Sequence, residues 1–220
     1  MTHAYALPNP DNPDEWLAWA EQQLEPLGLS VDLLHQVVEN AKRKKDATSP
    51  LAPSQTPGQD QWSEAVISFR EQTGWDPDEK DGVSRTWHPS RSFYVVVRAG
   101  DDKTGQFGTC PTPQTGLRKI LGKLIDNVPD TAPLFEVTAA GKPISPPVDP
   151  PELWLFMFSF RDGLLYSEFS SPAERDGDTI TKYHRRIPLP PLPYKPTDTS
   201  VIVTPDDDLD TGPDIDVQPI

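Results

Sequence analysis

The sequence predicts an α+β fold, in which an antiparallel β-sheet with one or two packed helices forms the body of the protein. Three observations lead to this class. Before Gly74, apolar residues recur at helical spacing. From Arg91 onward, β-branched and aromatic residues form short runs that are typical of strands. Asp162-Gly163 separates two such runs, as in a tight hairpin. Helices and strands that occupy separate parts of a chain are typical of an α+β domain.

Two short helices are expected near the N-terminus. Asn12 and Pro13 are typical of a helix start, where asparagine caps free backbone N–H groups and proline needs no donor. Ser30 can cap a second helix, whose negative end would carry the four cations of residues 42–45. We expect residues 1–45 to form a helical hairpin arm, which must dock its apolar stripes on the body or on a partner chain.

A flexible linker is expected after the hairpin arm. Residues 46–59 contain three prolines among serine, threonine and glutamine, and they contain no aromatic residue. A third helix is expected from about Gln61 to Thr73, with Gly74 as its C-terminal stop. Residues 75–89 are polar and are expected to form a loop.

The remaining elements of the α+β body, residues 60–195, are mostly strands. We expect a helix at residues 115–127 and strands at residues 92–98, 134–138 and 179–187, together with a hairpin at residues 153–169. The Asp162-Gly163 turn fixes the register of this hairpin, which pairs Phe160 with Leu165, Phe158 with Ser167 and Phe156 with Phe169. One face of the hairpin is therefore mostly aromatic, and we expect it to be buried.

The formal net charge of −14 is distributed unevenly. Residues 1–84 have 15 acids and 6 bases, and residues 85–195 have 12 acids and 14 bases. The proline-rich tail, residues 196–220, has 7 acids and no base, and such a composition predicts a disordered, solvated segment. Nucleic-acid-binding proteins gain affinity from Lys and Arg on phosphates, so we do not expect direct binding of nucleic acid.

The sequence predicts a cytoplasmic protein that does not enter a membrane. The longest apolar run, Leu153–Phe158, is much shorter than the roughly 18–20 residues of a transmembrane helix. The first residues lack the basic start and apolar stretch of a secretory signal. Cys110 is the single cysteine, so the chain cannot form an internal disulfide, which fits a reducing compartment.

The sequence contains no complete motif for catalysis, a cofactor or a metal. The glycines of residues 116–122 lack the spacing of a phosphate-binding loop, and the four histidines share no metal-ligand spacing. The acids of residues 206–217 lack the glycine and glutamate that a calcium loop requires. Cys110 has no neighbouring base or helix N-terminus to stabilise a thiolate. We therefore expect no enzyme activity, no cofactor and no bound metal.

A basic stripe is the first candidate surface for a partner. Lys182, His184 and Arg186 alternate along the predicted strand at residues 179–187, so their side chains are expected on one face. Such a stripe can bind an acidic partner. The alternative interpretation is an edge strand whose charges prevent pairing with another chain.

A proline-rich segment is the second candidate surface. Arg185 and Arg186 precede Pro188 and Pro191, and aromatic grooves recognise this spacing when the segment forms a polyproline helix. The alternative interpretation is a stiff connector between the last strand and the tail.

These features together favour a non-catalytic protein that binds another protein, such as an adaptor, an assembly subunit or an immunity-like binder. A homo-oligomer is compatible with this interpretation. One alternative is an acidic inhibitor that competes with nucleic acid for a basic partner protein. Another is an enzyme whose site residues are scattered in the sequence and converge in the fold. Three structural features would distinguish these interpretations. An exposed apolar patch would favour the assembly protein, a continuous carboxylate ribbon would favour the inhibitor, and a pocket joining Cys110 to a histidine would favour the enzyme.

Overall fold

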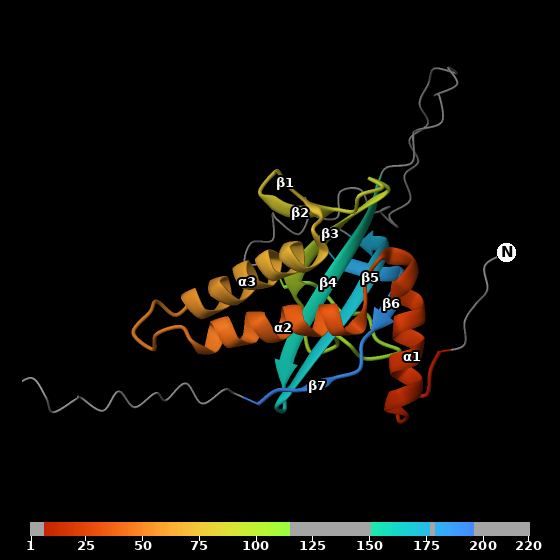
Figure 1. The fold of residues 1–220 in the computed structure, drawn as a ribbon, viewed down its shortest axis with the longest axis horizontal. Coiled ribbons are helices and arrows are strands. Elements are labelled where there is room, and N and C mark those ends of the chain that lie inside the picture. Colours follow the sequence, from red (N-terminus) through yellow and green to blue (C-terminus); the bar gives the residue numbers. More distant parts are fainter. Residues whose placement is uncertain (1–6, 115–150, 177–178, 196–220) are drawn as a thin grey trace, which may run out of the picture.

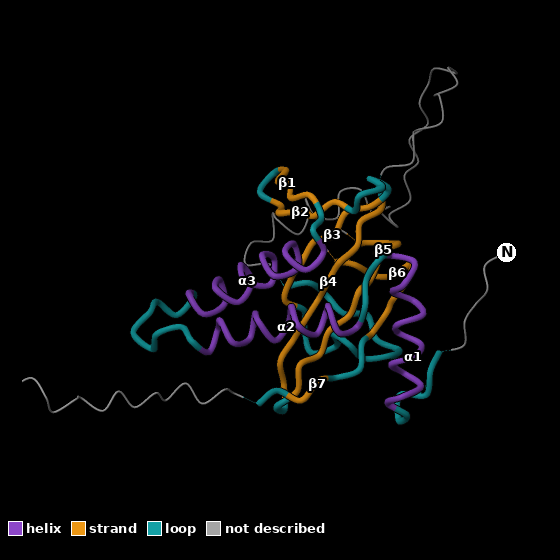
Figure 2. Tube along the Cα trace, viewed as in Figure 1, coloured by secondary structure: helices purple, strands orange, loops and turns teal. Residues whose placement is uncertain are grey.

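The computed structural model describes residues 7–114, 151–176 and 179–195 (Figure 1). The helices are α1 (Pro13–Leu24), α2 (Val31–Asp46) and α3 (Thr56–Thr73), and a short 3-10 helix, η1 (Glu25–Leu27), follows α1. All three α-helices lie on one face of the β-sheet (Figures 1 and 2). The predicted α+β class and the predicted helices near the N-terminus are confirmed. None of the helices in these ranges is both long and apolar enough to cross a membrane.

The sheet is mixed, whereas the sequence predicts an antiparallel one. Its strands are β1 (Asp76–Lys80), β2 (Val83–Trp87), β3 (Phe93–Ala99), β4 (Glu152–Arg161), β5 (Leu164–Asp176), β6 (Thr179–Pro188) and β7 (Leu192–Pro193). They are ordered β1-β2-β3-β4-β5-β6, and β7 also pairs with β5. Only β3 and β4 run parallel among these strands. The long connection between them allows the chain to return to the same edge of the sheet, as parallel pairing requires.

The β4–β5 hairpin has the predicted register. Asp162 (φ 52°) and Gly163 (φ 73°) both adopt positive φ, as a type I′ turn requires. The three predicted pairs, Phe160–Leu165, Phe158–Ser167 and Phe156–Phe169, are all formed. Phe156, Phe158 and Phe169 are buried against the helices, whereas Phe160 is 41% exposed at the end of β4. The aromatic face is therefore buried, apart from Phe160 near the turn, and the opposite face is also buried at Leu155 and Met157.

The Gly163→Val substitution is expected to lower the free energy of unfolding by about 1–2 kcal/mol, because a β-branched residue resists positive φ. Gly58→Val is the matched control, since Gly58 lies in α3 without a positive φ, and a side chain added there would meet no heavy atom within 4 Å of its Cβ. We expect the control to change stability by less than about 0.5 kcal/mol. Equal melting temperatures for wild type and Gly163→Val would contradict the turn assignment.

Residues 75–89 form a hairpin, so the predicted loop is wrong. Asp81 (φ 56°) and Gly82 (φ 77°) make the tight turn between β1 and β2. The sequence contains the same Asp-Gly signal here as at residues 162–163. The flanking residues are polar because β1 lies at the edge of the sheet, where its side chains are mostly exposed.

The helix starts follow from capping chemistry. The Asn12 side chain accepts from the backbone N–H of Glu15 (3.4 Å), and the Ser30 hydroxyl accepts from that of Leu33 (3.2 Å). α3 begins at Thr56, earlier than expected, so the connection between α2 and α3 is shorter than the predicted linker of residues 46–59. The main helical pair is α2 with α3, instead of α1 with α2.

One hydrophobic core joins the helices to the sheet. Leu24 of α1 and Leu34 of α2 are fully buried in the same cluster as Phe156 and Phe169 of the sheet. The indole N–H of Trp16 also donates to the carbonyl oxygen of Pro188 at 2.8 Å. The predicted hairpin arm is thus packed on the body. The predicted helix at 115–127, the strand at 134–138 and the tail at 196–220 lie outside the described residues.

Candidate functional site

The predicted basic stripe is not a single free surface. Lys182 is exposed and forms an ion pair with Glu174 (3.0 Å), and His184 is exposed. Arg186 instead turns towards the fully buried carboxylate of Glu168 (2.6 Å). A partner-binding role for Lys182 and His184 stays a prediction.

The predicted proline-rich segment is packed in the domain. Arg185 donates to the backbone and side-chain oxygens of Gln23 in α1, at 2.9 Å and 3.0 Å. Pro188 is buried at the end of β6, and Pro191 is partly buried. The interactions of this segment support the interpretation as a connector, since its basic residues and its first proline already have partners in the domain.

The surroundings of Cys110 do not favour a reactive thiolate. Its thiol donates to the carbonyl oxygen of Ile180 (3.4 Å), and burial raises the thiol pKa, whereas a reactive cysteine needs a lowered pKa. The described part of the chain also contains no cluster of three or more metal-ligating side chains.

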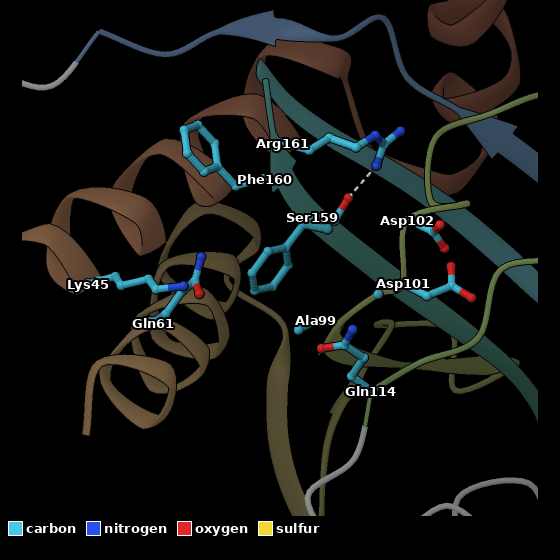
Figure 3. A pocket seen from close by; sticks show the side chains of 11 residues that line it. Lys45, Gln61, Ala99, Asp101, Asp102, Gln114, Ser159, Phe160 and Arg161 are labelled. Atoms are coloured by element: carbon cyan, nitrogen blue, oxygen red, sulfur yellow. Dashed lines mark hydrogen bonds between the residues drawn. The ribbon is translucent and has the colours of Figure 1, made fainter. Parts of the chain in front are cut away.

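A pocket of about 290 Å³ lies where the parallel strands β3 and β4 end (Figure 3). Because parallel strands reach the same edge of a sheet with their carboxyl ends, such edges commonly hold ligands. α2, α3, both strand ends and the loop after β3 contribute to the wall: Lys45, Gln61, Ala99, Gly100, Asp101, Asp102, Gln114, Phe158, Ser159, Phe160 and Arg161. We name this set the strand-end pocket.

Gln61 is the buried polar residue of the strand-end pocket. α3 is fixed against β3 by the neighbouring Trp62, whose indole N–H donates to the carbonyl oxygen of Val97 (3.1 Å). This contact holds Gln61 over the strand ends, where the residue is only 8% exposed. Its side-chain amide forms no hydrogen bond with another described residue, and its atoms are not among the fully buried polar atoms that lack a partner, so the amide is open to the pocket.

The charged groups of the strand-end pocket differ in how firmly they are held. Arg161 donates to the Ser159 hydroxyl (2.6 Å) and to the carbonyl oxygen of Thr104 (3.0 Å), so its guanidinium is fixed. Asp101 accepts two backbone N–H groups of its own loop, at 3.0 Å and 2.9 Å. Lys45 and Asp102 form no ion pair with any described residue, and Figure 3 shows them on different sides of the pocket.

A cation and two aromatic rings support one wall of the strand-end pocket. The Lys42 ammonium lies 4.4 Å from the Phe160 ring centre and 4.8 Å from that of Tyr194. Asp46 accepts a hydrogen bond from the Tyr194 hydroxyl (2.8 Å) and also pairs with Lys42. Burial raises the pKa of Tyr194 to about 12, and the hydrogen bond to Asp46 adds to this effect. Phe160 is therefore held in place although it is 41% exposed.

The strand-end pocket was not predicted from the sequence. In the sequence Lys45 is one of the cations at the end of the expected second helix and Gln61 begins the expected third helix, and the two meet the strand ends only in the folded chain. Comparisons with protein-family models, with curated proteins and with solved structures found no significant match.

Proposed function

We propose that this protein is a non-catalytic binding protein that takes up a short segment of a partner protein in the strand-end pocket. The observation that carries the proposal is the Gln61 amide, which belongs to a residue only 8% exposed, lines the pocket and has no hydrogen-bond partner among the described residues. The amide is open to the pocket, so its hydrogen bonds can form with a ligand in place of water. A hydrogen bond of this kind contributes about 0.5–1.5 kcal/mol.

A peptide group is the ligand chemistry that fits this amide best. The Gln61 side chain has both a donor and an acceptor, as a peptide group has, so the two can pair through two hydrogen bonds. Phe160, which is 41% exposed, adds apolar surface at the same wall. Recognition of main-chain groups together with apolar contact is typical of sites that bind peptide segments.

The polar lining favours binding over catalysis. The Ser159 hydroxyl accepts a hydrogen bond from the Arg161 guanidinium, which cannot act as a base at neutral pH. Among the eleven lining residues there is no histidine or cysteine. The cytoplasm is the compartment that we propose for this binding, and the free thiol of Cys110 supports it.

Gln61→Leu is expected to reduce peptide binding by about tenfold, the equivalent of roughly 1.4 kcal/mol. The measurement is binding of the full chain to an array of short, capped peptides of random sequence. Leucine removes both hydrogen-bonding groups with little change in volume, so we expect unchanged or higher thermal stability.

Gln59→Leu is the matched control for this array, because Gln59 is exposed on the same helix and does not line the strand-end pocket. The control should bind the same peptides as the wild type with the same affinity. Binding that is equal in wild type and Gln61→Leu, or no binding to any peptide, would contradict the proposed function.

A further inference from the structure

We infer that the segment taken up by the strand-end pocket is acidic, and that the last turn of α2 selects it. The inference rests on the proposed function and specifies the chemistry of the partner. The last turn of α2 contains three bases, Arg43, Lys44 and Lys45, and Lys45 lines the pocket.

Two of these bases are free to contact a ligand. Arg43 lies 3.8 Å from Glu39, one turn earlier in the same helix. Lys44 and Lys45 form no ion pair with any residue that the structure describes, and Lys44 is exposed. An acidic ligand could therefore approach both ammonium groups without first displacing an internal carboxylate.

The carboxylate that follows Lys45 in the sequence already has partners. Asp46 follows Lys45 directly, but it pairs with Lys42 and accepts from the Tyr194 hydroxyl. These contacts hold the pKa of Asp46 below its usual value although burial acts in the opposite direction. Asp46 therefore remains an anion that is directed towards Lys42 and Tyr194. The charge of Lys45 also lowers its pKa, so Asp46 offsets part of the charge of Lys45 and leaves Lys44 the less compensated of the two lysines.

The charges within the strand-end pocket have an uneven arrangement. Lys45 and the fixed guanidinium of Arg161 are its cations, and Asp101 and Asp102 are its anions, of which Asp101 accepts two backbone N–H groups. Asp102 stays open, but Figure 3 shows it on the side opposite Lys45. The end of the pocket formed by α2 is thus positive.

This positive end is unusual in a chain whose net charge is −14. The net negative charge of the chain repels an acidic peptide and the cations at the end of α2 attract it, so this turn is expected to be a preferred place of approach. Exposed ion pairs are weak and are screened by salt, so the selectivity should be modest and largest at low ionic strength.

The test is an NMR titration of the ¹⁵N-labelled full chain with three capped peptides that differ only in carrying aspartate, asparagine or lysine. At low salt we expect the aspartate peptide to bind about fivefold more tightly than the asparagine peptide, with shifts at Lys45, Gln61 and Phe160. The Lys44→Gln/Lys45→Gln variant should bind the aspartate peptide and the asparagine peptide with equal affinity. Lys182→Gln is the control, since it removes an exposed lysine of β6, and it should keep the preference.

The outcomes separate this inference from the proposed function. Equal affinity for the three peptides, with binding still weakened by Gln61→Leu, would overturn the acidic preference and leave the proposed function standing. A preference that is lost in Lys182→Gln and kept in Lys44→Gln/Lys45→Gln would overturn the assignment to α2. A failure of Gln61→Leu to weaken binding of any of the peptides would contradict both.

Discussion

Replacing Arg186 by leucine is expected to lower the free energy of unfolding by about 3–5 kcal/mol, because removal of one partner leaves a buried charge alone. The Glu168 carboxylate is fully buried and accepts from the Arg186 guanidinium (2.6 Å), the Ser170 hydroxyl (2.7 Å) and the backbone N–H of Gly105 (2.8 Å). Arg186 also donates to the carbonyl oxygen of Gln106 (3.0 Å), so the loop after β3 depends on the same side chain. Chemical denaturation would measure the loss.

Two further variants make this result specific. Lys182→Leu removes an exposed ion pair of the same strand and should cost at most about 1 kcal/mol. The Glu168→Leu/Arg186→Leu variant should be more stable than Arg186→Leu alone, because no lone charge remains in the interior. A cost below about 1 kcal/mol for Arg186→Leu would mean that Arg186 is a free surface residue, as the predicted basic stripe requires.

Leu34→Ala is expected to lower the free energy of unfolding by about 2–5 kcal/mol in a single cooperative transition. Leu34 is fully buried in α2, and its cluster includes Phe156 of β4 and Phe169 of β5. A cavity at this position therefore removes contacts from the core that the helices share with the sheet, so the whole domain should lose stability. Thermal and chemical denaturation, each followed by two probes, would measure the change.

Leu17→Ala is the matched control, since Leu17 is 41% exposed on α1 and its removal should cost about 1 kcal/mol or less. Two separate transitions, with Leu34→Ala shifting only one of them, would contradict the shared core. They would show instead that residues 1–45 fold as an arm of their own.

Turn and cap chemistry made much of the fold predictable from the sequence. Asp162-Gly163 predicted a turn, because Asp and Gly are among the few residues that adopt positive φ readily. It also predicted the register, because a two-residue turn fixes which residues of the two strands lie opposite each other. The second Asp-Gly turn, at Asp81-Gly82, was missed because the polar composition of β1 is the opposite of strand composition. An edge strand needs no apolar side chains, since its pairing with β2 and the ion pairs of Asp78 with Arg85 and of Asp76 with Arg91 hold it.

Contacts between distant segments could not be predicted in this way. The parallel pairing of β3 with β4 depends on where a long connection returns, and local patterns contain no such information. The alternation of Lys182, His184 and Arg186 did not reveal that a buried Glu168 on the neighbouring strand would pair with Arg186. Register shifts between β5 and β6 also break the simple alternation along these strands.

The candidate site could not be predicted for a related reason. Gln61 is an unremarkable residue in the sequence, because whether a side-chain amide has a partner depends on the packing around it. Its burial arises when Trp62 docks α3 on the edge of β3, which is a contact between segments far apart in the chain.

The side-chain amide of Gln61 offers the most direct measurement of peptide binding in the strand-end pocket. In the ¹⁵N-labelled full chain, the two protons of this amide give a signal that disappears in Gln61→Leu and stays in Gln59→Leu, which identifies it. On saturation with a peptide selected from the array, we expect this signal to shift and its protons to exchange more slowly with water. Peptide binding that shifts other signals and leaves the Gln61 amide unchanged would contradict uptake of the peptide by the strand-end pocket.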